Sequence, residues 1–170
     1  LQLNNRSLKD YNNILEFGCG YGRLIKYISE IKNTAMVYGC DTLPGAINYC
    51  QRKYKGTFIL NDYFPPIYLE DEQFDFIYSY SVFTHLSEEN HIRWLKELAR
   101  ILKPNGVMLH SVKSPLALRR MELFSPENLL KYRDNSIKNY ETDISYHYIV
   151  DNPRNPEYGQ TIINKDYILK

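Results

Sequence analysis

Two acids and three alternating glycines near the start of the chain are the residue types whose spacing could do chemistry. Gly18, Gly20 and Gly22 follow a short apolar run that predicts a buried strand. Glycine adopts positive φ and lets backbone N–H groups approach a bound ligand closely. Glu16 lies in that strand, and Asp41 closes the next apolar run. A strand, a glycine turn, a helix and a second acid-ended strand are the parts of a site that binds a nucleoside cofactor.

The spacing of the glycines separates two kinds of cofactor. A dinucleotide fingerprint places a third glycine where this chain has Arg23. Glu16 stands two residues before the first glycine, and its carboxylate would repel a pyrophosphate. The same carboxylate suits a ligand that carries an ammonium and a sulfonium group. An NAD(P)-dependent oxidoreductase is therefore the less favoured alternative.

At these residues the sequence resembles the class I S-adenosylmethionine-dependent methyltransferases, whose first motif is an acid, one residue and three alternating glycines. The resemblance covers about residues 12–113. It implies that S-adenosyl-L-methionine is the cofactor, that Asp41 hydrogen-bonds both ribose hydroxyls, and that Asp62 binds the adenine amine with Tyr63 and Phe83 near the ring. The full set of implied cofactor-binding residues is Glu16, Gly18, Cys19, Gly20, Tyr21, Gly22, Asp41, Thr42, Asn61, Asp62, Tyr63, Ser79, Tyr80 and Phe83.

Strands alternate with helices along the chain, which predicts a parallel sheet covered on both faces. After the first strand, the expected elements are strands at 35–41, 57–60, 74–79 and 107–112, a helix over about 88–102 and a turn at 103–106. The resemblance implies the same fold class. That class is a three-layer α/β/α, doubly wound, Rossmann-like methyltransferase fold with a mostly parallel sheet.

The chain is expected to divide into a cofactor-binding part and a substrate-side part. Residues 1–113 are expected to form the cofactor-binding α/β core, and residues 114–170 the substrate-side or cap region of the same domain. The strands that the family places after the fifth are not evident, although 146–150 and 161–163 are candidate strands. Since the chain also begins with Leu1 rather than Met, we expect a fragment of a longer protein that lacks its last strands.

The cofactor supplies the reactive methyl group, so the chemical step left to a protein side chain is the removal of a proton from the acceptor. His85, directly after the fourth strand, is the candidate general base; its alternative role is a local hydrogen bond that supports the loop. His91 is expected on a helix surface, and Trp94 off the apolar stripe and partly exposed. No catalytic metal is expected, because the cysteines lack ligand spacing and no carboxylates cluster after the fourth strand.

The amino-acid composition limits which partners the protein could bind and in which cellular compartment it is expected. A net charge of +1 over 170 residues, without a long basic run, gives no electrostatic case for nucleic acid. No apolar stretch approaches the ~20 residues that span a bilayer. Three cysteines without metal spacing suggest reduced thiols in a cytoplasmic protein. The expected acceptor is a small molecule, a sugar or a lipid; a protein acceptor and a catalytically silent cofactor-binding or interaction module are the alternatives.

Overall fold

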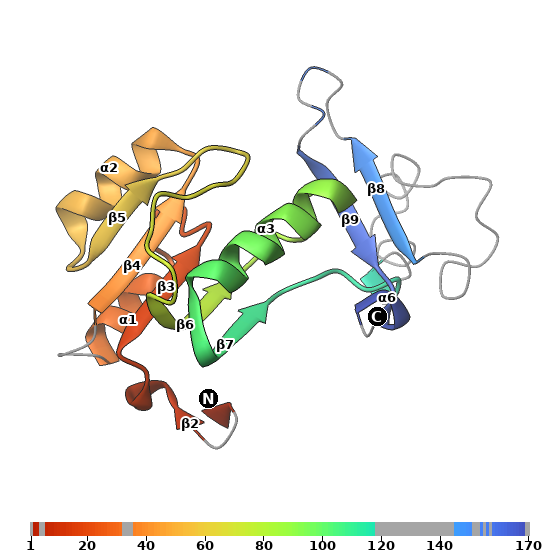
Figure 1. Ribbon diagram of the computed structural model, residues 1–170. Coiled ribbons are helices and arrows are strands. Elements are labelled where there is room, and N and C mark those ends of the chain that lie inside the picture. Colours follow the sequence, from red (N-terminus) through yellow and green to blue (C-terminus); the bar gives the residue numbers. More distant parts are fainter. Residues whose placement is uncertain are drawn as a thin grey trace. The chain divides into compact units, whose positions relative to one another are not determined.

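The computed structural model describes residues 2–3, 6–31, 36–117, 145–150, 154, 156 and 158–168. In chain order (Figure 1) the elements are β1 (Gln2–Leu3), β2 (Arg6–Ser7), the 3-10 helix η1 (Leu8–Asp10), β3 (Asn13–Phe17), α1 (Ile25–Ile31), β4 (Met36–Asp41), α2 (Pro44–Lys53), β5 (Thr57–Leu60), β6 (Phe74–Ser79), α3 (Glu88–Ile101), β7 (Leu102–His110), β8 (Tyr146–Val150), β9 (Gly159–Ile163) and α6 (Lys165–Ile168). The strands expected at 57–60 and 74–79 are confirmed to the residue.

The chain forms two compact units. The first comprises residues 1–82 and 92–110, and the second comprises residues 83–91 and 111–170. The sequence-based division after residue 113 keeps 83–91 with the core, whereas this segment packs with the second unit. Residues 118–144 of the expected cap region lie outside the described residues.

The first unit is built around a five-stranded sheet in the order β5-β4-β3-β6-β7. Every pairing in this sheet is parallel, with Leu15 of β3 opposite both Tyr38 of β4 and Ile77 of β6. From β3 the chain moves outward to β5 and then returns to the other side of β3 through β6 and β7. Doubly wound sheets bind ligands outside the carboxyl ends of their strands at such a reversal. The predicted doubly wound, mostly parallel fold is confirmed.

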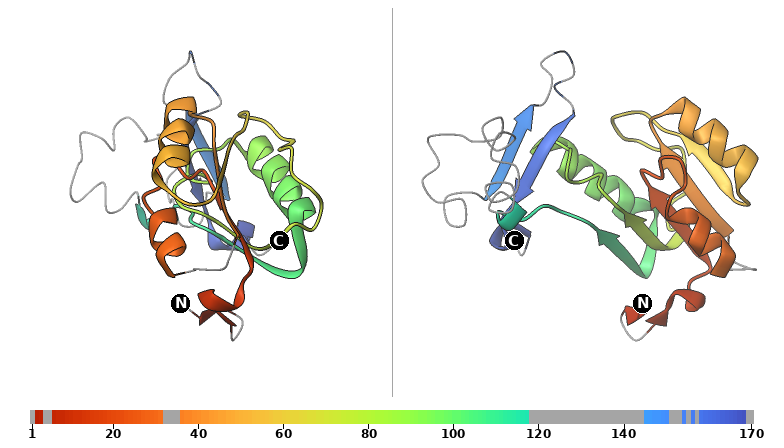
Figure 2. Two further views of the ribbon diagram at one scale, coloured as in Figure 1. Left: turned by 90° about the vertical axis from the view of Figure 1, so that its left-hand side faces the viewer. Right: turned by 180° about the vertical axis from the view of Figure 1, so that it is seen from behind.

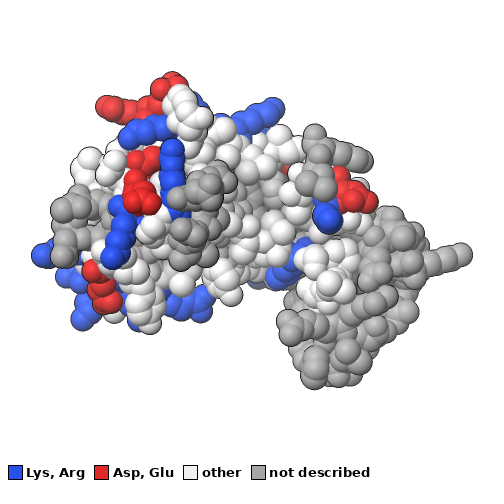
Figure 3. All heavy atoms as spheres, turned by 90° about the horizontal axis from the view of Figure 1, so that it is seen from below, with Lys and Arg blue, Asp and Glu red and all other residues white. Residues whose placement is uncertain are grey.

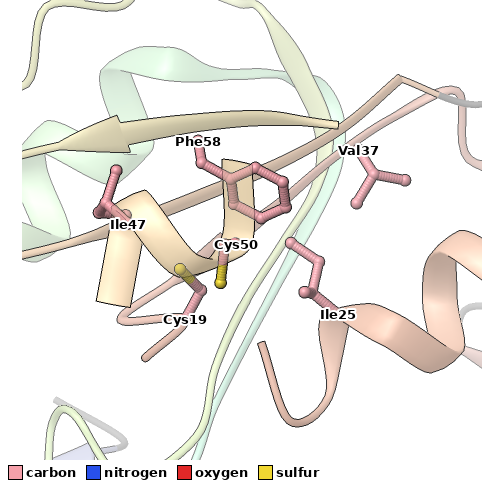
Figure 4. Packing of buried hydrophobic residues seen from close by; sticks show 6 residues of the cluster. All are labelled: Cys19, Ile25, Val37, Ile47, Cys50 and Phe58. Carbon is pink, nitrogen blue, oxygen red and sulfur yellow. The ribbon is translucent and has the colours of Figure 1, made fainter. Parts of the chain in front are cut away.

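Helices cover both faces of this sheet. α1 and α2 lie on one face, and residues 92–101 of α3 lie on the other (Figure 2). Beneath α1 and α2, six buried side chains pack together (Figure 4): Cys19, Ile25, Val37, Ile47, Cys50 and Phe58. Burying an apolar side chain contributes roughly 1.5–3 kcal/mol. Because Cys19 belongs to the glycine turn, this packing fixes the turn against the helices and the sheet.

The buried face of α3 differs from the expected stripe. Trp94 is 1% exposed and packs against Phe17 of β3 with ring centroids 4.6 Å apart, whereas Ile92 is 42% exposed. The expectation of a partly exposed Trp94 is wrong. The expected apolar face contains only the aliphatic residues of the helix, and it leaves out Trp94, the largest apolar side chain of the helix. His91 is also buried rather than on the surface, and this burial lowers its pKa to about 4.

Strand β7 begins earlier than expected. It starts at Leu102, directly after α3, rather than at Val107. Phe74 of β6 pairs with Leu102, but Phe76 already pairs with Val107, so the register shifts between them. The expected turn at 103–106 is therefore a bulge within the strand, where extra residues lie opposite a shorter partner segment.

In the second unit, β8 and β9 pair antiparallel and form a two-stranded sheet of their own. Both strands fall on the candidate strands of the sequence. β9 is also bonded to the chain that follows β6. The Thr161 N–H donates to the Thr84 carbonyl at 2.9 Å, and the Gly159 N–H donates to the His85 carbonyl at 3.1 Å. Residues 84–85 are thereby fixed within this unit.

Two negative findings apply to the described residues. None of their helices is long and apolar enough to cross a membrane. Nor do any three of their His, Cys, Asp and Glu side chains lie together in a way that could hold a metal ion.

Candidate functional site

The glycine turn after β3 is held by hydrogen bonds within the chain. The N–H groups of Gly18 and Cys19 both donate to the Cys40 carbonyl, at 2.8 and 2.9 Å. Gly18, Gly20 and Gly22 have φ values of 76°, 50° and 76°. Residues with a side chain rarely adopt these angles, so the backbone itself requires the three glycines. The turn is therefore preformed at the carboxyl ends of β3 and β4.

The three glycines differ in what an added side chain would meet. A Cβ on Gly18 would lie 2.2 Å from Val82 Cγ2, and one on Gly22 would lie 2.4 Å from Tyr54 Cε2. A Cβ on Gly20 would have no heavy atom within 4 Å. Gly18 and Gly22 are packed against protein, whereas Gly20 faces open space. Gly20 is thus the point at which a ligand can approach the backbone of the turn.

Asp41 ends β4 and joins the two loops beside this open space. Its Oδ2 accepts a hydrogen bond from the Gly20 N–H at 2.7 Å, and its Oδ1 accepts one from the Leu43 N–H at 3.0 Å. Each carboxylate oxygen has a second lone pair. The half-buried Asp41 carboxylate can therefore hold the turn and still accept hydrogen bonds from the hydroxyls of a ligand.

Glu16 is buried beside the turn, with 3% of its surface exposed. The Tyr78 hydroxyl donates to Glu16 Oε2 at 2.9 Å. Burial raises the pKa of Glu16 to about 7, against the lowering effects of the Tyr78 hydrogen bond, the Ile25 backbone and the Arg23 charge. Burial also raises the pKa of Tyr78, so the tyrosine is the donor. Near neutral pH the Glu16 carboxyl changes charge readily, and a cation bound beside it would favour the ionised form.

The side chain of Cys19 points away from the open side of the turn. It lies in the buried cluster with Cys50 (Figure 4), and Cys50 Sγ donates to the Gly20 carbonyl at 3.3 Å. Burial raises the pKa values of Cys19, Cys40 and Cys50, so these thiols stay protonated at neutral pH. Only the backbone of Cys19 is available to a ligand. Sequence reasoning missed Cys50 as a support of the turn, because no motif signals it.

The segment after β5 contains two candidate hydrogen-bond acceptors for a ligand. The Asn61 N–H donates to the Asp41 carbonyl at 3.1 Å, and Asn61 Nδ2 donates to the Asp62 carbonyl at 2.8 Å. Asn61 Oδ1 is buried without a hydrogen-bond partner, an arrangement that costs roughly 1–3 kcal/mol. The side chains of Asp62 and Tyr63 are exposed. Asn61 Oδ1 and the Asp62 carboxylate are thus adjacent groups that could accept from a ligand amine.

Two exposed tyrosines lie on segments next to the turn. Tyr21, between two of its glycines, is 61% exposed and contacts the Tyr49 ring with centroids 5.6 Å apart. Tyr80, after β6, is 54% exposed, and the Arg23 guanidinium lies 5.4 Å from its ring centroid. Exposed rings offer apolar contact area to a bound ligand.

The expected cofactor residues divide between the two units. Ser79 ends β6 and is buried, with its Oγ 2.8 Å from His110 Nδ1. Phe83 lies in the second unit, fully buried with its ring against that of His91. All the expected residues except Phe83 lie at the carboxyl ends of four neighbouring strands of the first unit: Glu16, Gly18, Cys19, Gly20, Tyr21, Gly22, Asp41, Thr42, Asn61, Asp62, Tyr63, Ser79 and Tyr80.

His85 belongs to the second unit, which holds its ring on two sides. His85 Nδ1 is 2.7 Å from the Gly159 carbonyl, and the ring stacks on Tyr158 with centroids 4.6 Å apart. A carbonyl only accepts, so Nδ1 carries the proton of the neutral ring and Nε2 is the basic nitrogen. The local hydrogen bond expected as the alternative role is present. It also favours the tautomer that carries its proton on Nδ1.

A comparison with known protein families shows which family the chain belongs to. A family model described as a methyltransferase domain matches residues 15–110, more than half of the chain. The chain belongs to this methyltransferase family. The predicted membership in the class I S-adenosylmethionine-dependent methyltransferases is confirmed, and so is the predicted cofactor. Membership also decides against the nicotinamide-dependent oxidoreductase.

Two curated relatives of this methyltransferase domain have different acceptors in their names. The domain is 30% identical over 101 residues to the tRNA N(3)-methylcytidine methyltransferase trm141 of Schizosaccharomyces pombe, a match over 55% of this chain and 41% of that protein. It is 31% identical over 111 residues to the phosphoethanolamine N-methyltransferase of Plasmodium falciparum, over 63% of this chain and 41% of that protein. The chain thus spans about two fifths of the length of these relatives.

A solved structure agrees with the family assignment. A SAM-dependent methyltransferase from Aquifex aeolicus matches the methyltransferase domain with a TM-score of 0.55 and 26% identity. The match covers 64% of this chain and 60% of that chain. The likeness therefore supports both the Rossmann-like fold and the cofactor class.

Proposed function

We propose that this domain binds S-adenosylmethionine across the carboxyl ends of β3, β4 and β5 and transfers its methyl group to a small molecule, a sugar or a lipid. The observation that carries the proposal is the open space at Gly20 beside the partly exposed Asp41 carboxylate. A glycine that no protein atom requires for packing, next to an acid with spare lone pairs, suits a ligand that brings hydroxyls close to the backbone.

Each part of the cofactor has a candidate partner. In this proposal Asp41 accepts from the two ribose hydroxyls, as charge-assisted hydrogen bonds worth roughly 1.5–3 kcal/mol. Glu16 lies one strand away, and its carboxylate would attract the methionine ammonium of the cofactor. Asp62 would accept from the adenine amine, with Asn61 as the competing acceptor because of its unpaired buried Oδ1. Tyr21, Tyr63 and Tyr80 would supply ring contacts at the rim.

His85 is the proposed general base for an acceptor hydroxyl or amine. When bound, the cofactor supplies an electrophilic methyl group on its sulfonium. The acceptor atom must lose a proton as it gains the methyl, and a positioned base contributes about 10²–10⁴-fold to such a step. The Gly159 carbonyl, which can only accept, favours the proton on Nδ1 of His85, and the proposal takes Nε2 as the nitrogen that accepts the acceptor's proton.

The charge of the chain favours an acceptor other than nucleic acid. The face shown in Figure 3 carries both Lys and Arg and Asp and Glu side chains, and the net charge of the chain is only +1. A nucleic-acid acceptor favours a basic stripe, because phosphate neutralisation dominates the affinity. The phosphoethanolamine relative supports a small acceptor, and the tRNA relative makes RNA the competing outcome. The three free, buried thiols support a reducing, cytoplasmic location.

Calorimetric titration with S-adenosylmethionine, S-adenosylhomocysteine and NAD⁺ tests the cofactor part of the proposal. We expect binding of the first two ligands and none of the third. Methyl transfer is then measured with radiolabelled cofactor against separate pools of amines, hydroxylated small molecules, sugars, lipids and tRNA. Label in tRNA alone would contradict the proposed acceptor class. Binding with no transfer to any pool would support the catalytically silent module instead.

A further inference from the structure

The segment between β5 and β6 is held along its length by three side chains of α3. This segment, residues 61–73, runs beside the helix in both views of Figure 2. The three side chains are Trp94, Glu97 and Arg100, spaced three residues apart and so adjacent on the helix surface. They bond to the backbone of the segment between its two ends, whereas the ends, Asn61 and Gln73, are bonded to Asp41 and Asn13 of the sheet.

Trp94 makes the first of these contacts. Its Nε1 donates to the Tyr63 carbonyl at 2.9 Å, while its ring packs against Phe17 with centroids 4.6 Å apart. Phe17 directly precedes Gly18, and Tyr63 directly follows Asp62. One buried side chain thus touches the residue before the glycine turn and the residue after the candidate adenine-binding pair.

Glu97 and Arg100 continue the same line of contacts. Glu97 Oε1 accepts from the Ile67 N–H at 3.0 Å. Arg100 donates to the carbonyls of Leu69 and Ile67, at 3.0 and 3.2 Å, and pairs with Asp71 and Glu97. Arg100 also holds the pKa of Glu97 below its ordinary value through their hydrogen bond. These contacts fix the far part of the segment. The near part is held at Asn61 by the 3.1 Å bond from its N–H to the Asp41 carbonyl, and at Tyr63 by Trp94.

We propose that Trp94 is a positioning residue for the cofactor, which sets the distance between the glycine turn and the adenine-binding segment from the opposite face of the sheet. The proposal rests on the proposed function, because it takes Asn61 or Asp62 as the acceptor for the adenine amine. Trp94 itself does not touch the cofactor. It acts by bonding the Tyr63 carbonyl, since without this donor the carbonyl must turn to find water and its neighbours turn with it.

The test compares the Trp94→Phe variant with the wild-type domain and with Ile101→Val, a change at a buried position of the same helix that has no hydrogen-bonding group. Phenylalanine keeps an aromatic ring against Phe17 and removes the N–H together with part of the buried indole volume, and Ile101→Val controls for a small loss of buried volume. Amide hydrogen exchange is followed for residues 61–69 and for the glycine turn. Affinity is measured for S-adenosylhomocysteine and for S-inosylhomocysteine, in which a carbonyl replaces the adenine amine.

For Trp94→Phe we expect faster exchange at residues 61–69 with the glycine turn unchanged. We also expect about a tenfold loss of affinity for S-adenosylhomocysteine, the net contribution of about one hydrogen bond, and a smaller loss for S-inosylhomocysteine. Ile101→Val should leave all these quantities near wild type. If Trp94→Phe does not fold, Arg100→Gln takes its place in the exchange measurement. Arg100 is half-exposed, and its substitution should loosen the same segment.

Unchanged exchange at residues 61–69 would overturn the proposal, and so would equal losses of affinity for both ligands together with faster exchange throughout the domain. Failure of the wild-type domain to bind either ligand would instead count against the proposed function. The exchange pattern is independent of ligand, so it decides even then whether Trp94 orders this segment.

Discussion

The Tyr78 hydroxyl donates a 2.9 Å hydrogen bond to Glu16 Oε2, and the two residues lie opposite each other in the register of β3 and β6. The carboxyl group is 3% exposed, and burial raises its pKa from 4.5 to about 7. The folded protein therefore binds this proton more tightly than the unfolded chain does. The resulting stabilisation is complete below about pH 4.5 and is lost as the pH rises through 7.

The Glu16→Gln variant should consequently be more stable than the wild-type domain at pH 8 and nearly equal to it at pH 4. Glutamine keeps the shape and can still accept from Tyr78, but it never ionises. The expected gain in the free energy of unfolding at pH 8 is about 3 kcal/mol at most. Urea denaturation at several pH values measures it. A difference between the two proteins that does not change with pH would contradict the raised pKa.

Ligand affinity should show the opposite pH dependence, because the ionised carboxylate attracts the ammonium of S-adenosylmethionine. Binding is expected to tighten as the pH rises from 6 to 8. The Tyr78 hydrogen bond lowers the Glu16 pKa, so Tyr78→Phe should move this rise in affinity to higher pH. Calorimetry across the pH range measures both curves. Superimposable curves for the variant and the wild type would show that Tyr78 does not tune the carboxyl group.

The Glu16–Tyr78 pair also illustrates how far the sequence could predict the site. The place of Glu16 before three alternating glycines is a local pattern, and so is the acid that ends β4. Tyr78 is 62 residues away, and its role depends on the register between β3 and β6, which no local pattern contains. Trp94 was missed for a similar reason, since its partners Phe17 and Tyr63 lie on distant segments. Strand boundaries were predicted well where apolar runs end in polar residues.

The glycines of the turn should respond differently to alanine. Gly18→Ala would place a Cβ 2.2 Å from Val82 Cγ2 at a φ of 76°, so we expect the loss of several kcal/mol of stability from overlap and backbone strain together. Gly20→Ala meets no heavy atom within 4 Å, so its cost is limited to the backbone, roughly 1–2 kcal/mol. Its methyl group would instead occupy the space proposed for the cofactor and weaken binding.

Thermal unfolding and S-adenosylhomocysteine titration of both variants separate these effects. Gly45→Ala is the matched control, because its Cβ would meet only the Tyr21 hydroxyl at 3.8 Å and its φ is not positive. Full affinity in a folded Gly20→Ala domain would mean that the open side of the turn does not face the cofactor.

Asp41→Ala should weaken the binding of S-adenosylhomocysteine by about tenfold or more, through the loss of charge-assisted hydrogen bonds to the ribose. The change also frees the N–H groups of Gly20 and Leu43, so part of its effect is structural. Asp75→Ala is the matched control. The Asp75 carboxylate likewise accepts from two backbone N–H groups, those of Asn12 and Asn13, but at the amino ends of the strands. Equal affinities for the two variants would refute the ribose assignment.

His85→Asn should separate catalysis from cofactor binding. Asparagine can still donate to the Gly159 carbonyl that now accepts from His85 Nδ1 at 2.7 Å, so the local structure is kept while the basic nitrogen is lost. On an acceptor that the wild-type domain methylates, we expect the turnover rate to fall by about 10²–10⁴-fold with an unchanged Kd for S-adenosylhomocysteine. His147→Asn, on β8 of the same unit, is the matched control and should turn over at the wild-type rate. Turnover by His85→Asn equal to that of His147→Asn would leave the His85 ring with only its structural role, as the partner of Gly159 and Tyr158.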